Sequence, residues 1–215
     1  LNDAIDMAKI LDVSLHQISI EKLYNVFTNS LSNIWGPKKD LGLTEENLQA
    51  RIRGNIIMAL SNEFNCLVIS TGNKSEIAMG YCTLYGDMCG GFALIKDVPK
   101  TLVYQLCKWR NQRNYVIPIS IIDRPPSAEL RPNQKDSDTL PPYEDLDPIL
   151  EAYIEEDKSI NELIQEGYDE VLVKQIINAV DKNEYKRRQS PPGVKITPRS
   201  FDKDRRMPIV NKYYN

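Results

Sequence analysis

Apolar and polar residues recur along this chain with two different periods. Recurrence every three or four residues predicts amphipathic helices, whereas apolar or alternating runs predict strands. The first pattern predicts helices at 3–11, 21–34, 44–62, 75–83, 97–110, 143–155, 159–165 and 169–182, and the second predicts strands at 14–20 and 66–70. Together they indicate an α/β protein with an open parallel sheet flanked by helices.

Three local features refine these elements. The helix at 21–34 is expected to turn Leu23, Val26 and Phe27 inward. The long helix at 44–62 begins with Thr44 followed by Asn47, which is close to a capping box. A Trp-Gly-Pro stretch predicts a loop at 35–40, and glycines predict another at 85–94.

A short polar window follows the most apolar strand. The run 66–70 is apolar almost throughout, as expected for a parallel strand buried on both faces. The residues Thr-Gly-Asn-Lys-Ser-Glu follow at 71–76, and Thr-Leu-Tyr-Gly-Asp follow at 83–87. Open α/β sheets bind ligands at the carboxyl end of their strands, so we expect a nucleotide and a metal in this window.

The start of the next helix supports this expectation. Asn73 or Ser75 would cap it, and the free N–H groups of a helix N-terminus favour anions. The Glu76 carboxylate could hold a divalent cation that bridges phosphates. The alternative is an ordinary strand–turn–helix in which Lys74 and Glu76 are solvated.

Composition and charge narrow the function classes. The chain has 215 residues, 41% hydrophobic and 27% charged, which fits one soluble globular domain. Eight basic residues against two acidic ones at 186–206 could meet phosphates, or could form a solvated or dimer-facing tail.

Nucleic-acid binding needs a broader basic face with aromatic residues, so we expect no nucleic acid. No apolar run approaches the ~18 residues that cross a membrane, so we expect no membrane either.

The cysteines show no pattern typical of a redox or zinc site. Cys66, Cys82, Cys89 and Cys107 show no C-x-x-C spacing, and a single histidine, His16, cannot complete a zinc site with them. Reduced thiols in a cytosolic protein are expected.

A series of short motifs carries a resemblance to a known family. In chain order they are Glu46–Arg53, Gly90–Ala93, Ile95–Val98, Lys100–Thr101, Arg124–Leu130, Gln134–Asp136, Leu140–Tyr143, Glu184–Gln189 and Pro191–Gly193. Together they resemble the synthetase domain of glutamine-dependent NAD synthetase, from roughly Asp3 to Pro208. Leu94 and Asp202 depart from the family, which commonly has Pro and Gly there, and Asp202 could perturb a turn that favours Gly.

The resemblance implies a fold and a reaction. The fold is that of adenine nucleotide alpha hydrolases, an ATP pyrophosphatase type. ATP adenylates the nicotinate carboxylate of deamido-NAD, and ammonia, normally derived from glutamine, displaces AMP to give NAD. The Pro-rich segment 124–142 would cross the active site, and the tail 184–215 would reach it.

The family's Ser-Gly-Gly-x-Asp-Ser loop and its glutaminase domain do not occur in these residues. We therefore expect 1–215 to be a partial NAD synthetase domain that lacks the N-terminal strand and loop, and to be inactive by itself. The alternative is a non-catalytic remnant of the same fold that binds a nucleotide or a partner.

The resemblance also implies roles for individual residues. Lys100 and Glu76 would be catalytic, and Glu76 would bind Mg²⁺. Thr71, Lys100 and Ser127 would bind ATP. The residues expected to bind deamido-NAD are Asn47, Arg51, Glu76, Tyr81, Cys82, Thr83, Leu84, Asp87 and Lys186. Lys96 and Asp97 are weaker candidates that could equally cap a helix.

The implied cofactors are ATP and Mg²⁺, and the implied substrates are deamido-NAD, ATP and ammonia. The family further implies a glutaminase domain of the same polypeptide as a partner, a homodimer or higher homo-oligomer, and a cytoplasmic location.

Overall fold

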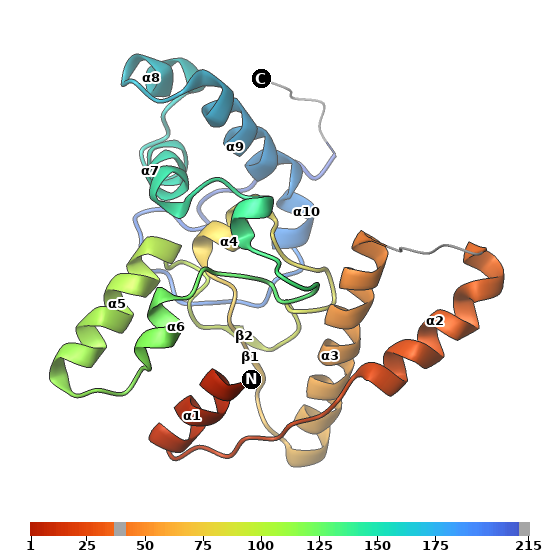
Figure 1. Ribbon diagram of the computed structural model, residues 1–215. Coiled ribbons are helices and arrows are strands. Elements are labelled where there is room, and N and C mark those ends of the chain that lie inside the picture. Colours follow the sequence, from red (N-terminus) through yellow and green to blue (C-terminus); the bar gives the residue numbers. More distant parts are fainter. Residues whose placement is uncertain (37–41, 211–215) are drawn as a thin grey trace.

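The computed structural model describes residues 1–36 and 42–210, and it consists mainly of helices around a small central sheet (Figure 1). In chain order the helices are α1 (Asn2–Ile10), α2 (Glu21–Trp35), α3 (Leu43–Phe64), α4 (Lys74–Met79), α5 (Lys100–Arg113), α6 (Ile119–Asp123), α7 (Tyr143–Ile154), α8 (Ile160–Gln165), α9 (Glu170–Lys182) and α10 (Glu184–Arg187), with a 3-10 turn at Asp136–Asp138. The predicted helices all form, with ends shifted by a few residues. Within the described ranges, no helix is both long and apolar enough to span a bilayer.

The sheet is parallel, as predicted, but very short. β1 (Ile69–Ser70) pairs with β2 (Phe92–Ala93), and Gly193 of the C-terminal tail adds a single bridge to Ala93. Helices lie on several sides of the two strands, and α4 follows β1 directly (Figure 1). The predicted α/β class with parallel strands is confirmed.

Two strand predictions are wrong in detail. The run 66–70 forms a strand only over its last two residues, and Leu67 and Ile69 are 69% and 51% exposed rather than buried on both faces. Residues 14–20 form no strand, and Leu15 and Ile18 are exposed. A strand needs a partner that supplies its hydrogen bonds, and an alternating sequence cannot show whether one lies beside it.

The main core lies between α4, α7, α8 and α9. The spacing of Val173, Ile176, Ile177 and Val180 on α9 places one apolar stripe on one side of the helix, and all four are fully buried. Burial of each such side chain stabilises the fold by about 1.5–3 kcal/mol. This cluster therefore holds α4, the helix that carries Glu76, in a fixed position.

α2, which packs against α3, is held more loosely. α2 forms as predicted, but Leu23, Val26 and Phe27 on its expected inner face are 43%, 62% and 41% exposed. Thr44 does not cap α3: the helix begins after Gly42 without a side-chain cap. The predicted 35–40 loop falls largely outside the described residues.

Gly80 ends α4 where only glycine fits. Its φ of 66° lies in the left-handed region that disfavours a side chain. A Cβ there would also lie 2.1 Å from the side chain of Asn183, whose amide nitrogen donates to the Met79 carbonyl oxygen. The tight turn brings the segment after α4 against the start of α10.

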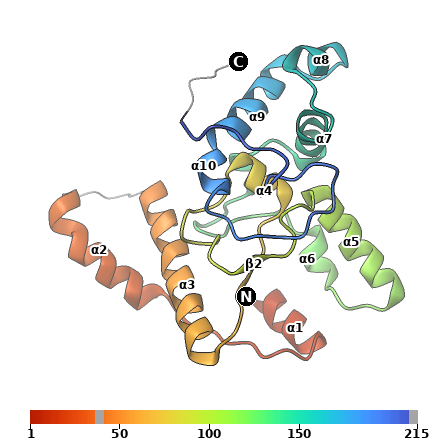
Figure 2. The same cartoon turned by 180° about the vertical axis from the view of Figure 1, so that it is seen from behind.

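The C-terminal tail returns across the centre of the molecule. After α10 it crosses in front of α4 when the molecule is viewed from behind (Figure 2). The Ala93 N–H donates to the Pro192 carbonyl oxygen, and the Asp97 carboxylate accepts from the backbone N–H groups of Ile196 and Thr197. The tail thus belongs to the folded core of the domain.

Candidate functional site

One groove of about 1330 Å³ collects the residues that the sequence proposed for substrate or metal binding, apart from the weaker candidates Lys96 and Asp97. Its walls come from α3, from the segment between β1 and residue 87, from the start of α5, from the Pro-rich segment and from α10. These residues are Asn47, Arg51, Thr71, Glu76, Tyr81, Cys82, Thr83, Leu84, Asp87, Lys100, Ser127 and Lys186. The Pro-rich segment therefore faces the groove, as expected from the resemblance.

Glu76 is fixed by the cap of its own helix. The Asn73 side chain accepts from the Glu76 N–H at 3.0 Å, and Glu76 Oε2 accepts from the Asn73 N–H at 3.2 Å. This is a capping box, and it confirms Asn73 rather than Ser75 as the cap. It leaves Glu76 Oε1 directed at another residue of the groove.

That residue is Lys100, the first of α5. Its Nζ donates to Glu76 Oε1 at 2.9 Å, and both side chains are about one-fifth exposed. Partial burial alone would lower the pKa of Lys100, but the Glu76 carboxylate outweighs it, so the pKa lies above its usual value. Lys100 therefore stays cationic, and its charge is available to an anion in the groove.

A short loop, residues 80–87, packs against α3 and forms the opposite wall. Asn47 Oδ1 accepts from the Thr83 hydroxyl at 2.8 Å, and Arg51 Nε donates to the Leu84 carbonyl oxygen at 3.1 Å. The Thr83 N–H donates in turn to Asp87 Oδ1. Asn47 and Arg51 are four residues apart on one face of α3, so they hold the loop as a pair.

Lys186 holds the same loop from its other end. Its Nζ donates to the carbonyl oxygens of Gly80 and Cys82, at 2.6 and 2.8 Å. Burial, together with the nearby Asp87 carboxylate, raises the pKa of the Cys82 thiol to about 12. Cys82 is thus a neutral thiol at physiological pH and contributes shape rather than charge.

Thr71 and Ser127 lie on the remaining sides of the groove. Thr71 follows β1 directly and is exposed. The Ser127 hydroxyl accepts from the Glu129 N–H at 3.0 Å, which closes a turn in the Pro-rich segment. Both residues therefore present oxygen atoms to the same space.

Asp136 lines the groove and was not proposed as a site residue from the sequence. It is 3% exposed, and its Oδ2 accepts from the Tyr143 hydroxyl at 2.7 Å. Its Oδ1 and the Tyr81 hydroxyl are both buried, and neither makes a hydrogen bond of good geometry among the residues that the structure describes. Burial and then the nearby Asp136 carboxylate raise the pKa of Tyr81, so the two groups lie close together. Unpaired buried polar atoms are costly, so these two atoms are available to a ligand. The family motif Gln134–Asp136 was the signal that could have found it, because the composition of a Pro- and Asp-rich segment does not indicate which residue is buried.

Three residues contact the C-terminal tail and do not line the groove: Lys74, Lys96 and Asp97. Lys74 is buried and lies 3.0 Å from Asp97 Oδ1 and 2.7 Å from Glu155 Oε1. Lys96 Nζ lies 2.5 Å from Asp202 Oδ1. The helix-cap reading of Lys96 and Asp97 and the solvated reading of Lys74 are therefore wrong. Asp202 does not perturb the tail, because it has no positive φ and it pairs with Lys96.

The protein ligands for a metal are few. In the described ranges, no three His, Cys, Asp or Glu side chains come together as a metal site. Mg²⁺ commonly uses one or two carboxylates and completes its octahedron with phosphates and water. The Glu76 carboxylate in the groove fits an ion shared with a bound nucleotide, and it does not fit an ion held by protein alone.

Comparison with known families matches residues 1–190 to the family described as NAD synthase. The glutamine-dependent NAD(+) synthetase of Acinetobacter baylyi is 53% identical over 213 residues, which are 98% of this chain and 39% of that protein. The chain thus spans about two-fifths of the length of this relative.

Two solved structures are similar as well. A glutamine-dependent NAD+ synthetase from Acinetobacter baumannii in complex with ADP is 46% identical, with a TM-score of 0.56, over 100% of this chain and 38% of that one. The corresponding enzyme from Cytophaga hutchinsonii is 25% identical with a TM-score of 0.79, over 98% of this chain and 36% of that one. The likeness to structures thus extends along nearly the whole chain.

Proposed function

Because the chain belongs to the NAD synthase family, we propose that the protein containing it converts deamido-NAD to NAD by ATP-dependent amidation. The observation that carries the proposal is the single groove in which all the expected substrate-binding residues meet. The reaction runs through an adenylated intermediate, and ammonia is derived from glutamine. It is a carbon–nitrogen ligation performed by the whole protein, of which this chain is the synthetase part.

ATP occupies the end of the groove near Lys100. Thr71 and Ser127 contribute hydroxyl groups, and Lys100 meets the phosphates. Glu76 would hold Mg²⁺ together with the phosphates, and a bound ion would neutralise part of their charge. Since Lys100 is cationic and already directed along the wall, it stabilises the negative charge that develops on the departing pyrophosphate.

Deamido-NAD occupies the side formed by α3 and the loop. Asn47 and Arg51 approach it from the helix, and Tyr81, Cys82, Thr83, Leu84 and Asp87 line its binding site, with Lys186 behind them. The Thr83 hydroxyl donates to Asn47, and the Thr83 N–H donates to Asp87. These hydrogen bonds restrict the loop, and a restricted loop loses less entropy on binding a substrate.

Asp136 and Tyr81 add a polar subsite to this groove. Their unpaired oxygen atoms accept or donate a hydrogen bond. A hydroxyl group of a substrate ribose satisfies both atoms, since it is at once a donor and an acceptor. This subsite would hold the substrate at a fixed distance from Lys100.

The chemistry has two steps. The nicotinate carboxylate oxygen attacks the α-phosphorus of ATP, and pyrophosphate leaves with the electron pair of the broken P–O bond. Ammonia then attacks the acyl carbon, the adduct loses a proton to water, and AMP leaves with the electron pair of the broken C–O bond. An acyl-adenylate is already activated, so positioning and charge neutralisation supply most of the catalysis.

The family resemblance further supports a homodimer, a cytoplasmic location and a glutaminase domain in the same polypeptide. A non-catalytic remnant of the same fold that binds a nucleotide or a partner is the second candidate. The test is to incubate the full-length protein with deamido-NAD, ATP, Mg²⁺ and ammonium, and to measure NAD, AMP and pyrophosphate. Equal amounts of the three products are expected. Formation of ADP and phosphate contradicts the mechanism, and nucleotide binding without NAD formation supports the remnant.

A further inference from the structure

We propose that Asp147, on α7, is a positioning residue that sets the geometry of the Lys100–Glu76 pair. The inference rests on the proposed function, which gives these two side chains their role. Asp147 carries no role in the motifs that identify the family, and it lies outside the groove.

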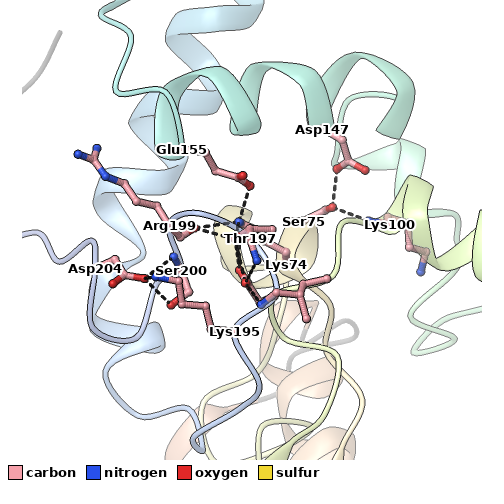
Figure 3. A network of polar contacts seen from close by, with 12 residues as sticks. Lys74, Ser75, Lys100, Asp147, Glu155, Lys195, Thr197, Arg199, Ser200 and Asp204 are labelled. Carbon is pink, nitrogen blue, oxygen red and sulfur yellow. Dashed lines mark hydrogen bonds and ion pairs between the residues drawn. The ribbon is translucent and has the colours of Figure 1, made fainter.

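The contacts of Asp147 join three helices. Its side chain is buried, and Oδ1 accepts from the Ser75 hydroxyl on α4 at 2.5 Å. Its Oδ2 accepts from both the N–H and the hydroxyl of Thr101 on α5, at 2.9 and 2.7 Å. All three of these hydrogen bonds therefore end on one carboxylate (Figure 3 shows Asp147, Ser75 and Lys100).

Ser75 extends the arrangement to the backbone of Lys100. Its hydroxyl oxygen accepts from the Lys100 N–H at 2.9 Å. Pro99, the residue before the helix, provides no side-chain cap. The first two N–H groups of α5 are therefore satisfied by residues from other helices, and a carboxylate at this place is also favoured by the helix dipole.

The residues that Asp147 holds are sequence neighbours of the ion pair in the groove. Ser75 precedes Glu76 on α4, and Lys100 precedes Thr101 on α5. By holding Ser75 and Thr101, Asp147 fixes the two backbone segments whose side chains form the ion pair. Asp147 itself lines a separate cavity of about 390 Å³. It thus acts through Lys100 and Glu76, and it does not touch the substrate.

The test uses the full-length protein with ammonium as the nitrogen source. Asp147→Asn keeps the size of the side chain but replaces one acceptor oxygen with an NH₂ group, which cannot accept from Ser75 or Thr101. We expect kcat to fall by about 10–100-fold, the scale of a misplaced catalytic group. The KM for deamido-NAD should stay within about twofold, because its proposed contacts lie on α3 and the loop. Asp145→Asn, an exposed change on the same helix, is the matched control and should leave both constants unchanged.

A double-mutant cycle separates positioning from general damage. If Asp147 acts through Lys100, Asp147→Asn combined with Lys100→Ala is no slower than Lys100→Ala alone. Effects that multiply, or a wild-type kcat in Asp147→Asn, overturn the inference. A wild-type kcat in Lys100→Ala instead contradicts the proposed role of Lys100, so the two failures are distinguishable.

Thr101→Val provides a milder variant in case Asp147→Asn does not fold, as judged by thermal unfolding. It removes the hydroxyl and keeps the N–H that donates to Asp147. Loss of one hydrogen bond predicts a fall in kcat of roughly 2–10-fold, again with no further loss in the Lys100→Ala background. A wild-type kcat in Thr101→Val counts against the inference.

Discussion

The Lys100 ammonium lies 2.9 Å from Glu76 Oε1, so the first residue of α5 and the first turn of α4 form an ion pair on the wall of the groove. The two residues are 24 positions apart in sequence. Their meeting places a cation and a carboxylate side by side on the wall of the groove.

Substitution of either member of this ion pair should lower kcat strongly. In the full-length protein, Lys100→Ala and Glu76→Ala are each expected to lower kcat by about 10²-fold, the cost of one preorganised electrostatic group. Steady-state NAD formation with ammonium measures the effect. Lys108→Ala, an exposed change on the same helix, should retain wild-type kcat. Wild-type rates in both site variants would reject the assignment of the groove.

The loop wall predicts a selective change in substrate affinity. Asn47→Ala removes the acceptor for the Thr83 hydroxyl, and we expect the KM for deamido-NAD to rise by roughly 3–10-fold, the scale of one hydrogen bond. The KM for ATP should change little. Asn55→Ala, exposed on the same helix, is the control. An equal rise in the KM for deamido-NAD and in the KM for ATP would show that the loop does not contact deamido-NAD selectively.

The unpaired oxygen of Asp136 predicts a role in binding. Asp136→Asn can place an NH₂ group where the substrate finds an acceptor. The affinity for deamido-NAD, measured by titration calorimetry, should fall by roughly 5–30-fold, as expected for a lost hydrogen bond in a buried site. Tyr81→Phe should weaken binding through the same subsite, so the two losses should not add. Unchanged affinity in both variants would indicate a structural pair bridged by water.

The raised pKa of Cys82 predicts low reactivity. Burial stabilises the neutral thiol, so the pKa of about 12 leaves almost no thiolate below pH 10. Cys66 is exposed. Iodoacetamide at pH 8.5, followed by mass spectrometry, should modify Cys66 well before Cys82, and raising the pH to 10 should not reverse this order. Faster labelling of Cys82 would show that the loop opens.

The buried network of Lys74 predicts a large loss of stability. Lys74→Met leaves the Asp97 and Glu155 carboxylates without their buried cation, and we expect a cost of about 3–5 kcal/mol in the free energy of unfolding. Lys195→Met breaks the half-exposed pair with Asp204 and should leave the free energy of unfolding nearly unchanged. Urea unfolding measures both. Equal losses would show that the tail is not anchored through Lys74.

Local sequence was sufficient where neighbouring residues decide the structure. The helix cap at Asn73, one of two residues expected there, and the helix at 169–182 depend on residues at most a few turns apart, and both were predicted. The strand at 66–70 was not predicted correctly, because its length depends on Phe92 and on how much of its surface other segments cover. The same limit explains why Asp136 and Asp147 were not recognised: both are buried by segments that lie far from them in sequence.

Lys74 and Lys100 show what the sequence determines and what the tertiary structure determines. The sequence by itself determined the helices, because periodicity and caps are encoded over short stretches. Its ordered motifs indicated the family, and the resemblance in turn implied many, though not all, of the side chains that line the groove. Only the tertiary structure decided that Lys74 binds the tail while Lys100 binds Glu76. The physical reason is that the role of a charge follows from its burial and its partners, and here Thr197 and Arg199, more than 120 residues away, supply them.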